Sequence, residues 1–193
     1  DVLFGTPYPL QSEANLGVMK KDHVNLIVHG HEPVLSEMIV ATAQKPEIIE
    51  YAKSKGAKGI QLSGICCTAN EILQRHGVPP AGTFLQQELA IVTGACDAMV
   101  VDVQCIMPNV QRVAQRFHTK VITTNPQAQI TGASHIEFEP DKADEVAQKI
   151  VKTAVDNYRH RKSNKVMIPD HPPAKIMAGF SVEQIIGALS KVN

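Results

Sequence analysis

The chain has 193 residues, and its 19 lysine and arginine residues balance 19 aspartate and glutamate residues, so the formal net charge is zero. This balance excludes a nucleic-acid or membrane-surface binder that depends on a basic field. Hydrophobic residues make up 44% of the chain and aromatic residues only 4%, which indicates a folded core of aliphatic side chains. We expect a cytoplasmic protein, because no apolar run approaches the roughly 20 residues of a membrane span and we see no secretory leader.

The chain opens with residues 1–20, which we expect to be an irregular lead-in because prolines and polar residues interrupt any period. Residues 24–28 form a short apolar run that is typical of a strand buried on both faces. Pro33 then begins a predicted helix with apolar residues at helical spacing, and a second helix is predicted over residues 46–55.

The same alternation of strands and helices continues along the chain. Further strands are predicted over residues 59–64, 98–103, 121–124 and 136–138, and further helices over residues 69–76, 84–93, 108–117, 141–161 and 181–189. This alternation predicts an α/β fold, a doubly wound, Rossmann-like parallel sheet with helices on both faces. We assign the Rossmann-like domain to residues 21–162. Residues 163–193 are assigned to a proline-rich linker and a C-terminal helix that packs on the same domain.

Candidate metal ligands follow three of the predicted strands. The first strand ends at His29-Gly30-His31, the second at Cys66-Cys67 and the third at Cys105. Because the carboxyl ends of parallel strands share one edge of a sheet, where ligands bind, we expect these side chains to converge. An imidazole with two thiolates is a soft ligand set, suited to zinc, copper or an iron–sulfur centre. Cysteines in a chain without a secretory leader also favour metal or redox chemistry over disulfides.

The cysteines are not expected to act alike. Cys66 and Cys67 are adjacent, and adjacent side chains at a strand end point in different directions, so we expect one to ligate and the other to pack. Cys96 precedes its strand and would lie at the opposite edge of the sheet. We interpret it as a small buried hydrophobe.

The histidines and one carboxylate leave two alternatives open. One of His29 and His31 would bind a metal while the other hydrogen-bonds to nearby backbone. Asp102, inside the third predicted strand, either orients a ligand or is a buried carboxylate bonded to backbone. The remaining six histidines have no comparable neighbours, and we interpret them as helix-end, loop or surface groups.

Several familiar site motifs are missing from the sequence. No G-x-G-x-x-G follows the first strand, so a dinucleotide site has little support despite the predicted fold. A phosphate-binding Gly-Lys-Ser/Thr loop, a His-Glu-x-x-His helix, a Gly-x-Ser-x-Gly elbow and paired C-x-x-C knuckles are also missing. The candidate site must therefore be assembled from distant parts of the chain.

Four longer segments resemble the central domain of anaerobic nickel-dependent carbon monoxide dehydrogenases, including the form that partners acetyl-CoA synthase. They read VHGHEPVLSEMI at residues 28–39, GICCTANE at 64–71, FLQQELA at 84–90 and MVVDVQCIMP at 99–108. Residues 4–7 and 178–183 look similar too, so the resemblance covers nearly the whole chain.

The resemblance implies an oxidoreductase that converts CO and water to CO2, two electrons and two protons, and also runs the reverse reaction. The chemistry would occur at a nickel–iron–sulfur cluster, the C-cluster, whose iron outside the cubane is held by a histidine and a cysteine. His31 and Cys67 match these two ligands and are the catalytic candidates, and Cys105 matches a further cluster thiolate. His29 stays open as the alternative to His31.

The resemblance further implies a homodimeric parent, an electron carrier such as ferredoxin, and in some forms acetyl-CoA synthase as a partner. Enzymes of the family are several times longer and carry further cluster ligands on segments absent from this chain. We therefore expect a middle domain that folds but is inactive and largely without its cluster. The alternatives are a non-catalytic metal-binding or interaction module, a nucleotide-binding Rossmann module and a hybrid-cluster (hydroxylamine reductase) relative.

Overall fold

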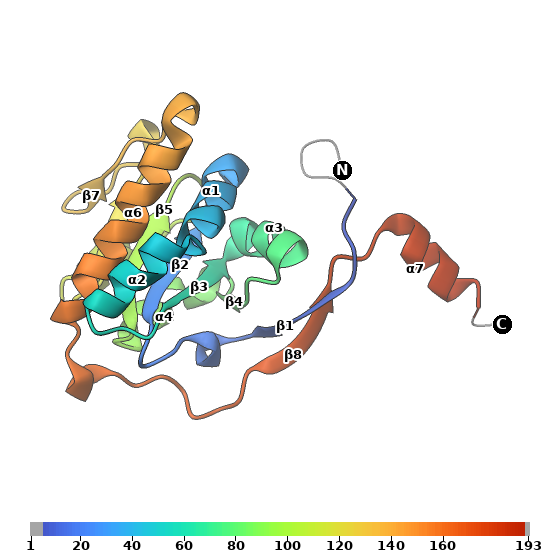
Figure 1. The fold of residues 1–193 in the computed structure, drawn as a ribbon, viewed down its shortest axis with the longest axis horizontal. Coiled ribbons are helices and arrows are strands. Elements are labelled where there is room, and N and C mark those ends of the chain that lie inside the picture. The colour runs from blue at the N-terminus through green and yellow to red at the C-terminus, as the bar shows by residue number, and fades with distance from the viewer. Residues whose placement is uncertain (1–5, 192–193) are drawn as a thin grey trace.

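The structure is a computed structural model that describes residues 6–191 (Figure 1). Its centre is a six-stranded parallel sheet in the order β4-β3-β2-β5-β6-β7. The strands are β2 (Val24–His29), β3 (Ile60–Ile65), β4 (Pro80–Gly82), β5 (Cys96–Val101), β6 (Lys120–Thr123) and β7 (Ser134–His135). From β2 the chain winds first toward one edge and then, from β5, toward the other, which is the strand order of a Rossmann-like sheet. The predicted doubly wound α/β fold is confirmed.

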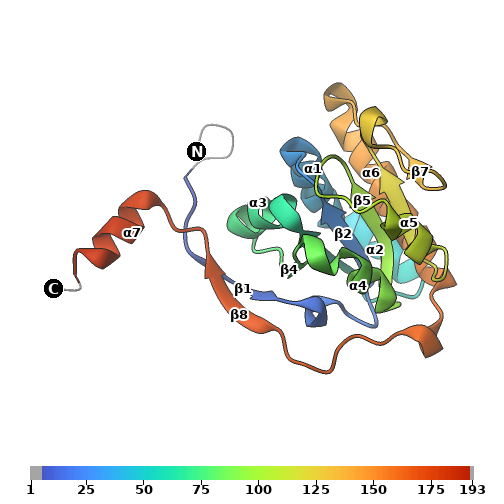
Figure 2. The ribbon, with the colours of Figure 1, turned by 180° about the vertical axis from the view of Figure 1, so that it is seen from behind.

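Helices cover both faces of the sheet, as predicted (Figures 1 and 2). The bounds are α1 (Pro33–Ala43), α2 (Pro46–Ser54), α3 (Cys66–His76), α4 (Gln87–Val92), α5 (Asn109–Ala114) and α6 (Ala143–Asn157). Side chains of β2 alternate between two cores, with Leu26 and Val28 packed against α1, α2 and α6 and Ile27 against α4 and α5. This alternation explains why the strand reads as a continuous apolar run.

Some element boundaries differ from the prediction. Helix α3 begins at Cys66, three residues before the predicted start, because Cys66 itself makes the turn from β3 with a left-handed φ of 63°. Strand β5 begins at Cys96 and ends at Val101, so Cys96 belongs to the strand. The last strand of the sheet, β7, lies just before the predicted residues 136–138. Short 3-10 turns occupy residues 16–18, 84–86, 126–128, 140–142, 158–160 and 163–165.

The two ends of the described chain form a second, two-stranded sheet that the sequence did not predict. Strand β1 (Leu10–Ala14) pairs with β8 (Ala174–Ala178) in antiparallel register. Residues 1–20 are therefore not irregular throughout, although residues 1–5 lie outside the described part. Likewise, residues 163–191 contain strand β8 in addition to the predicted linker and helix. We call the pair β1 and β8 the terminal ribbon.

We expected the C-terminal helix α7 (Val182–Leu189) to pack on the Rossmann-like domain, but only its first residue lines a pocket with residues of α1 and α3. The helix contains no buried residue, and Figures 1 and 2 show it beyond the end of the terminal ribbon. Ser181 caps it as expected, by accepting from the Gln184 N–H at 3.3 Å. Its apolar side chains Val182, Ile185, Ile186 and Leu189 are exposed. A helix can thus satisfy its local signals without the tertiary contact that its apolar face suggests.

A buried ion pair closes the amino-terminal edge of the sheet. Asp97 on β5 is fully buried and pairs with Arg161, while His118 Nε2 lies 2.8 Å from its Oδ1 and the Asn25 N–H donates to its Oδ2 at 2.7 Å. Arg161 also donates to two backbone carbonyls of the segment before β2, those of Lys21 at 2.7 Å and His23 at 2.8 Å. One carboxylate therefore joins β5, β2 and the segment after α6.

Replacing Asp97 with asparagine leaves a buried guanidinium without its counter-ion. We expect Asp97→Asn to lower the free energy of unfolding by about 3–5 kcal/mol, measured by urea denaturation. Asp144→Asn is the matched control, because Asp144 forms an exposed pair with Lys45 and should cost less than about 1 kcal/mol. Equal costs for the two substitutions would contradict the role given to the buried pair.

Candidate metal centre

The loops that carry His31 and Cys105 leave the sheet where it changes winding direction, at the carboxyl ends of β2 and β5. Strand β2 ends at His29, and Gly30 and His31 lead into α1. Strand β5 ends at Val101 and is followed directly by Asp102. Ligands of open α/β sheets bind outside this point because the loops from the two strands separate there.

Asp102 fills the space between these two strands. It is 3% exposed, and its carboxylate accepts the N–H of His31 at 2.6 Å and the N–H of Glu32 at 3.0 Å. It also accepts from its own neighbour, Val103. Of the two alternatives for Asp102, the structure favours the buried carboxylate bonded to backbone. Through these two hydrogen bonds the Asp102 carboxylate fixes the backbone at His31.

The same contact bears on nucleotide binding. The N–H groups of His31 and Glu32 open α1, and a helix N-terminus of this kind binds the pyrophosphate in dinucleotide-binding Rossmann folds. Here the Asp102 carboxylate already occupies that anion position. The arrangement disfavours the nucleotide-binding alternative, in agreement with the missing glycine fingerprint.

Gly30 permits the close approach of β2 to Asp102. Its φ is +137°, and a side-chain Cβ at this position would overlap the Asp102 carboxylate. Its carbonyl accepts the N–H of Thr68, in the first turn of α3, at 3.0 Å. Gly30 thus joins the loops that follow β2, β3 and β5.

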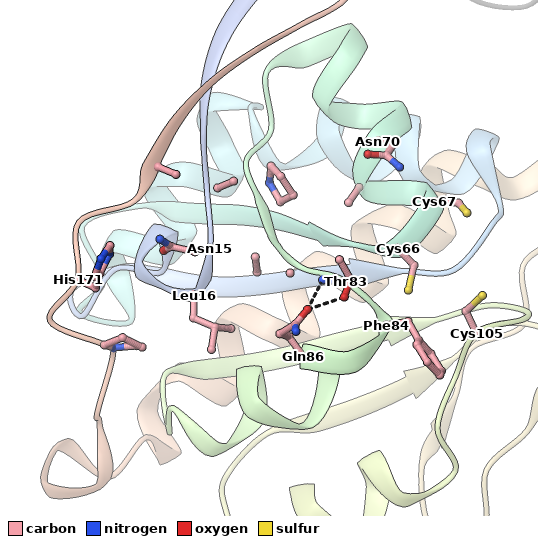
Figure 3. A pocket seen from close by; sticks show the side chains of 17 residues that line it. Asn15, Leu16, Cys66, Cys67, Asn70, Thr83, Phe84, Gln86, Cys105 and His171 are labelled. Carbon is pink, nitrogen blue, oxygen red and sulfur yellow. Dashed lines mark hydrogen bonds between the residues drawn. The ribbon is translucent and has the colours of Figure 1, made fainter.

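Three cysteines meet at one cavity beside this point (Figure 3). The cavity has a volume of about 920 Å³, and Cys66, Cys67 and Cys105 line it together with residues of β4, of the turn 84–86 and of the terminal ribbon. Cys67 and Cys105 are exposed and Cys66 is partly buried. Figure 3 shows the sulfur atoms of Cys66 and Cys105 turned toward each other. The three thiols that we expected at one sheet edge thus all line this cavity, whereas neither His29 nor His31 does.

The backbone holds the thiols in uncommon conformations. Cys66, Gln104 and Cys105 all have left-handed φ values, of 63°, 58° and 50°. Residues other than glycine adopt this region rarely, and they keep it when the surroundings fix it, often at functional sites. Burial, together with the neighbouring Cys105 and Cys67, raises the pKa of the Cys66 thiol to about 11.

The two histidines have different surroundings. His29 is fully buried, and its Nε2 lies 3.2 Å from Gln87 Oε1 inside the sheet domain. Burial lowers its pKa, with the Gln87 hydrogen bond acting in the opposite direction. His31 lies outside the sheet and is partly exposed, and its Nδ1 has no hydrogen-bond partner among the residues that the structure describes. His31 does not line the cavity.

These donors fit one side of a cluster better than a single-ion cage. Within residues 6–191, no three His, Cys, Asp or Glu side chains lie close enough to hold one metal ion. Accessible thiols and an imidazole nitrogen without a partner are nevertheless the donor types that iron–sulfur centres use. Such a cluster is larger than one ion and would take further ligands from elsewhere.

Cys96 is separate from this group. It is fully buried at the start of β5, at the opposite end of the strand from Asp102, and its Sγ contacts the Ala98 carbonyl oxygen at 3.4 Å. Burial raises the pKa of its thiol strongly. The sequence placed Cys96 before the strand, but its interpretation as a small buried core residue agrees with this position.

The described helices, which lie between residues 6 and 191, include none that is both long and apolar enough to cross a membrane.

Comparison with known proteins places this chain in a family. The model of the prismane/CO dehydrogenase family matches residues 1–192. The chain belongs to the prismane/CO dehydrogenase family. Carbon monoxide dehydrogenase 1 of Methanosarcina acetivorans is 56% identical over 189 residues, which are 98% of this chain and 30% of that protein.

Solved structures share this fold. The nickel-free carbon monoxide dehydrogenase of Thermococcus sp. AM4 is 56% identical with a TM-score of 0.94, over 98% of this chain and 30% of that one. An acetyl-CoA synthase/carbon monoxide dehydrogenase with nickel-containing [Fe4S4] clusters in its alpha subunits is 48% identical with a TM-score of 0.92. That match covers all of this chain and 28% of the other. The chain thus spans about 30% of the length of the relatives that it matches.

The contact of Gly30 with Asp102 leads to a stability prediction. We expect Gly30→Ala to lower the free energy of unfolding by more than about 3 kcal/mol, because a methyl group must displace a buried carboxylate. Gly56→Ala is the control. Gly56 also has a positive φ, of +92°, but nothing lies within 4 Å of a Cβ there, so only backbone strain of about 1–2 kcal/mol applies. Equal losses in urea denaturation would show that the carboxylate does not restrict position 30.

Proposed function

We propose that this chain forms one wall of the active site of a carbon monoxide dehydrogenase. The reaction converts CO and water to CO2, two protons and two electrons. The observation that carries the proposal is the meeting of Cys66, Cys67 and Cys105 at the carboxyl edge of a chain that is 56% identical to a carbon monoxide dehydrogenase. The family description also includes prismane proteins, but the relatives above are named carbon monoxide dehydrogenases, so we prefer this activity to hydroxylamine reduction.

In this proposal Cys67 and Cys105 hold the cluster as thiolates and His31 holds it through its imidazole. Cys67 is preferred to Cys66 because it is exposed, whereas Cys66 is partly buried. His31 is preferred to His29 because the His29 ring is enclosed in the core against Gln87. When bound, a nickel–iron–sulfur cluster supplies metal sites that bind CO and activate water.

The other residues of the site position these donors. Asp102 fixes the backbone of His31 through two N–H groups, and Gly30 holds the first turn of α3, which carries Cys67. The rest of the parent chain would supply the other ligands and the opposite wall. We further propose a homodimeric, cytoplasmic parent that passes its electrons to a ferredoxin-type carrier, in some cases as a partner of acetyl-CoA synthase.

The isolated chain should not catalyse this reaction. Its donors lie on one side only, so a cluster bound here would lack protein ligands on its other faces. We expect the purified 193-residue chain to retain no nickel by elemental analysis and to show no CO-dependent reduction of methyl viologen. The full-length parent, prepared in parallel, is the positive control. Bound nickel together with dye reduction by the isolated chain would refute the one-wall proposal.

Substitution in the full-length parent tests the ligand assignment. Cys67→Ser and Cys105→Ser should each lower CO oxidation by at least about 100-fold and deplete cluster nickel and iron, because a ligand is lost. Cys96→Ala is the matched control, since Cys96 is a buried core residue at the opposite end of β5 and should leave metal content close to wild type. If Cys96→Ala and Cys67→Ser behave alike, the assignment is wrong.

A further inference from the structure

A buried glutamine contacts the loop that carries Cys105. Gln87, the first residue of α4, is fully buried, which is unusual for a neutral amide with four hydrogen-bonding positions. Its Nε2 donates to the carbonyls of Phe84 at 2.8 Å and Cys105 at 3.2 Å. Its Oε1 accepts the N–H of Met107 at 2.9 Å and lies 3.2 Å from His29 Nε2. One side chain thus joins α4, β2 and the loop that continues from the Cys105 carbonyl to Met107.

These contacts determine the roles of the two side chains. The two carbonyls fix the NH2 end of the Gln87 amide, so Oε1 is an acceptor in both of its contacts. His29 must then donate through Nε2, which leaves its Nδ1 as a buried lone pair without a described partner. The hydrogen bond that the structure gives to the His29 ring is the one to Gln87. His29 therefore acts on the site through Gln87.

The loop after β5 needs such support. Gln104 and Cys105 are consecutive residues with left-handed φ values of 58° and 50°, a conformation that side-chain-bearing residues keep when contacts around them enforce it. Asp102 fixes the start of this loop by accepting the Val103 N–H. Gln87 fixes its end by binding the Cys105 carbonyl and the Met107 N–H. Cys105 lies between these two anchors, and its side chain lines the cavity.

We propose that Gln87, held by His29, is a positioning residue that fixes the direction of the Cys105 thiol toward the cluster. This inference rests on the proposed function, in which Cys105 is a cluster ligand. A buried amide could instead serve stability alone. The two roles predict different results. Loss of a positioning contact changes the orientation of Cys105 in particular, whereas loss of a purely stabilising contact lowers the stability of the whole domain.

The chain offers a matched control in Asn157. Its Nδ2 also bridges two backbone carbonyls, those of Asp97 at 2.8 Å and His118 at 2.6 Å, and it is nearly fully buried. It lies at the opposite edge of the sheet, beside the Asp97 ion pair. Replacing either amide with an apolar side chain of similar size removes the same kind of contact. Of the two amides, only Gln87 contacts a proposed cluster ligand, Cys105.

The experiment compares Gln87→Met with Asn157→Leu in the full-length parent. In metal-free protein, the rate of iodoacetamide alkylation of Cys105 is measured relative to Cys67 by peptide mass spectrometry. In metal-loaded protein, nickel affinity and the electron paramagnetic resonance spectrum of the reduced cluster are measured. We expect Gln87→Met to change the alkylation ratio, to alter the spectrum and to weaken nickel binding by about 10–100-fold. Asn157→Leu should lower the melting temperature while leaving the ratio and the spectrum as in wild type.

A milder variant keeps the test informative if Gln87→Met does not fold. Gln87→Asn keeps a neutral amide in the core but is one methylene group shorter, so it weakens the contacts with the Cys105 carbonyl and the Met107 N–H and should shift the same readouts in the same direction. Wild-type ratio and spectrum in a folded Gln87 variant would overturn the positioning role. Failure of the proposed function is distinguishable, because Cys105→Ser would then retain its cluster iron and nickel.

Discussion

The close approach of Gly30 to Asp102 is the constraint on which the rest of the site depends. The carboxylate binds the N–H groups that open α1, the glycine carbonyl binds the first turn of α3, and Asp102 N donates to the His29 carbonyl at 3.3 Å. Three loops that leave three strands are thereby held against one another. A single missing side chain makes this contact possible, since any Cβ at position 30 would occupy the space of the carboxylate.

This arrangement uses a Rossmann-like sheet for a purpose other than nucleotide binding. The position where such sheets change direction normally offers free N–H groups to a phosphate. In this chain the Asp102 carboxylate accepts those N–H groups. The candidate ligands are instead thiols beside this position, on α3 and on the loop after β5. The fold supplies rigidity, and the donors come from the residues that follow the strands.

The sequence allowed prediction of the sheet and of the thiol cluster because both depend on local signals. Apolar runs such as residues 24–28 identify strands, and residues just after parallel strands share an edge. The terminal ribbon was missed because β1 and β8 have no buried residue and pair over nearly the whole chain. The start of α3 was misplaced because Cys66 uses a left-handed turn that no residue type indicated. Gln87 gave no signal either, since only its tertiary contacts distinguish it from the partly exposed polar residues on either side of it.

The terminal ribbon has a consequence for the order of folding. It pairs Leu10 with Ala178, so its formation closes a loop that contains the entire Rossmann-like sheet, whereas each strand–helix–strand unit closes a much shorter loop. We therefore expect the sheet and its three donor positions to form before the ribbon. The ribbon and its connections also line the cavity beside the cysteines, through residues such as Ala14, His171 and Ala174. We therefore expect this cavity to be completed last.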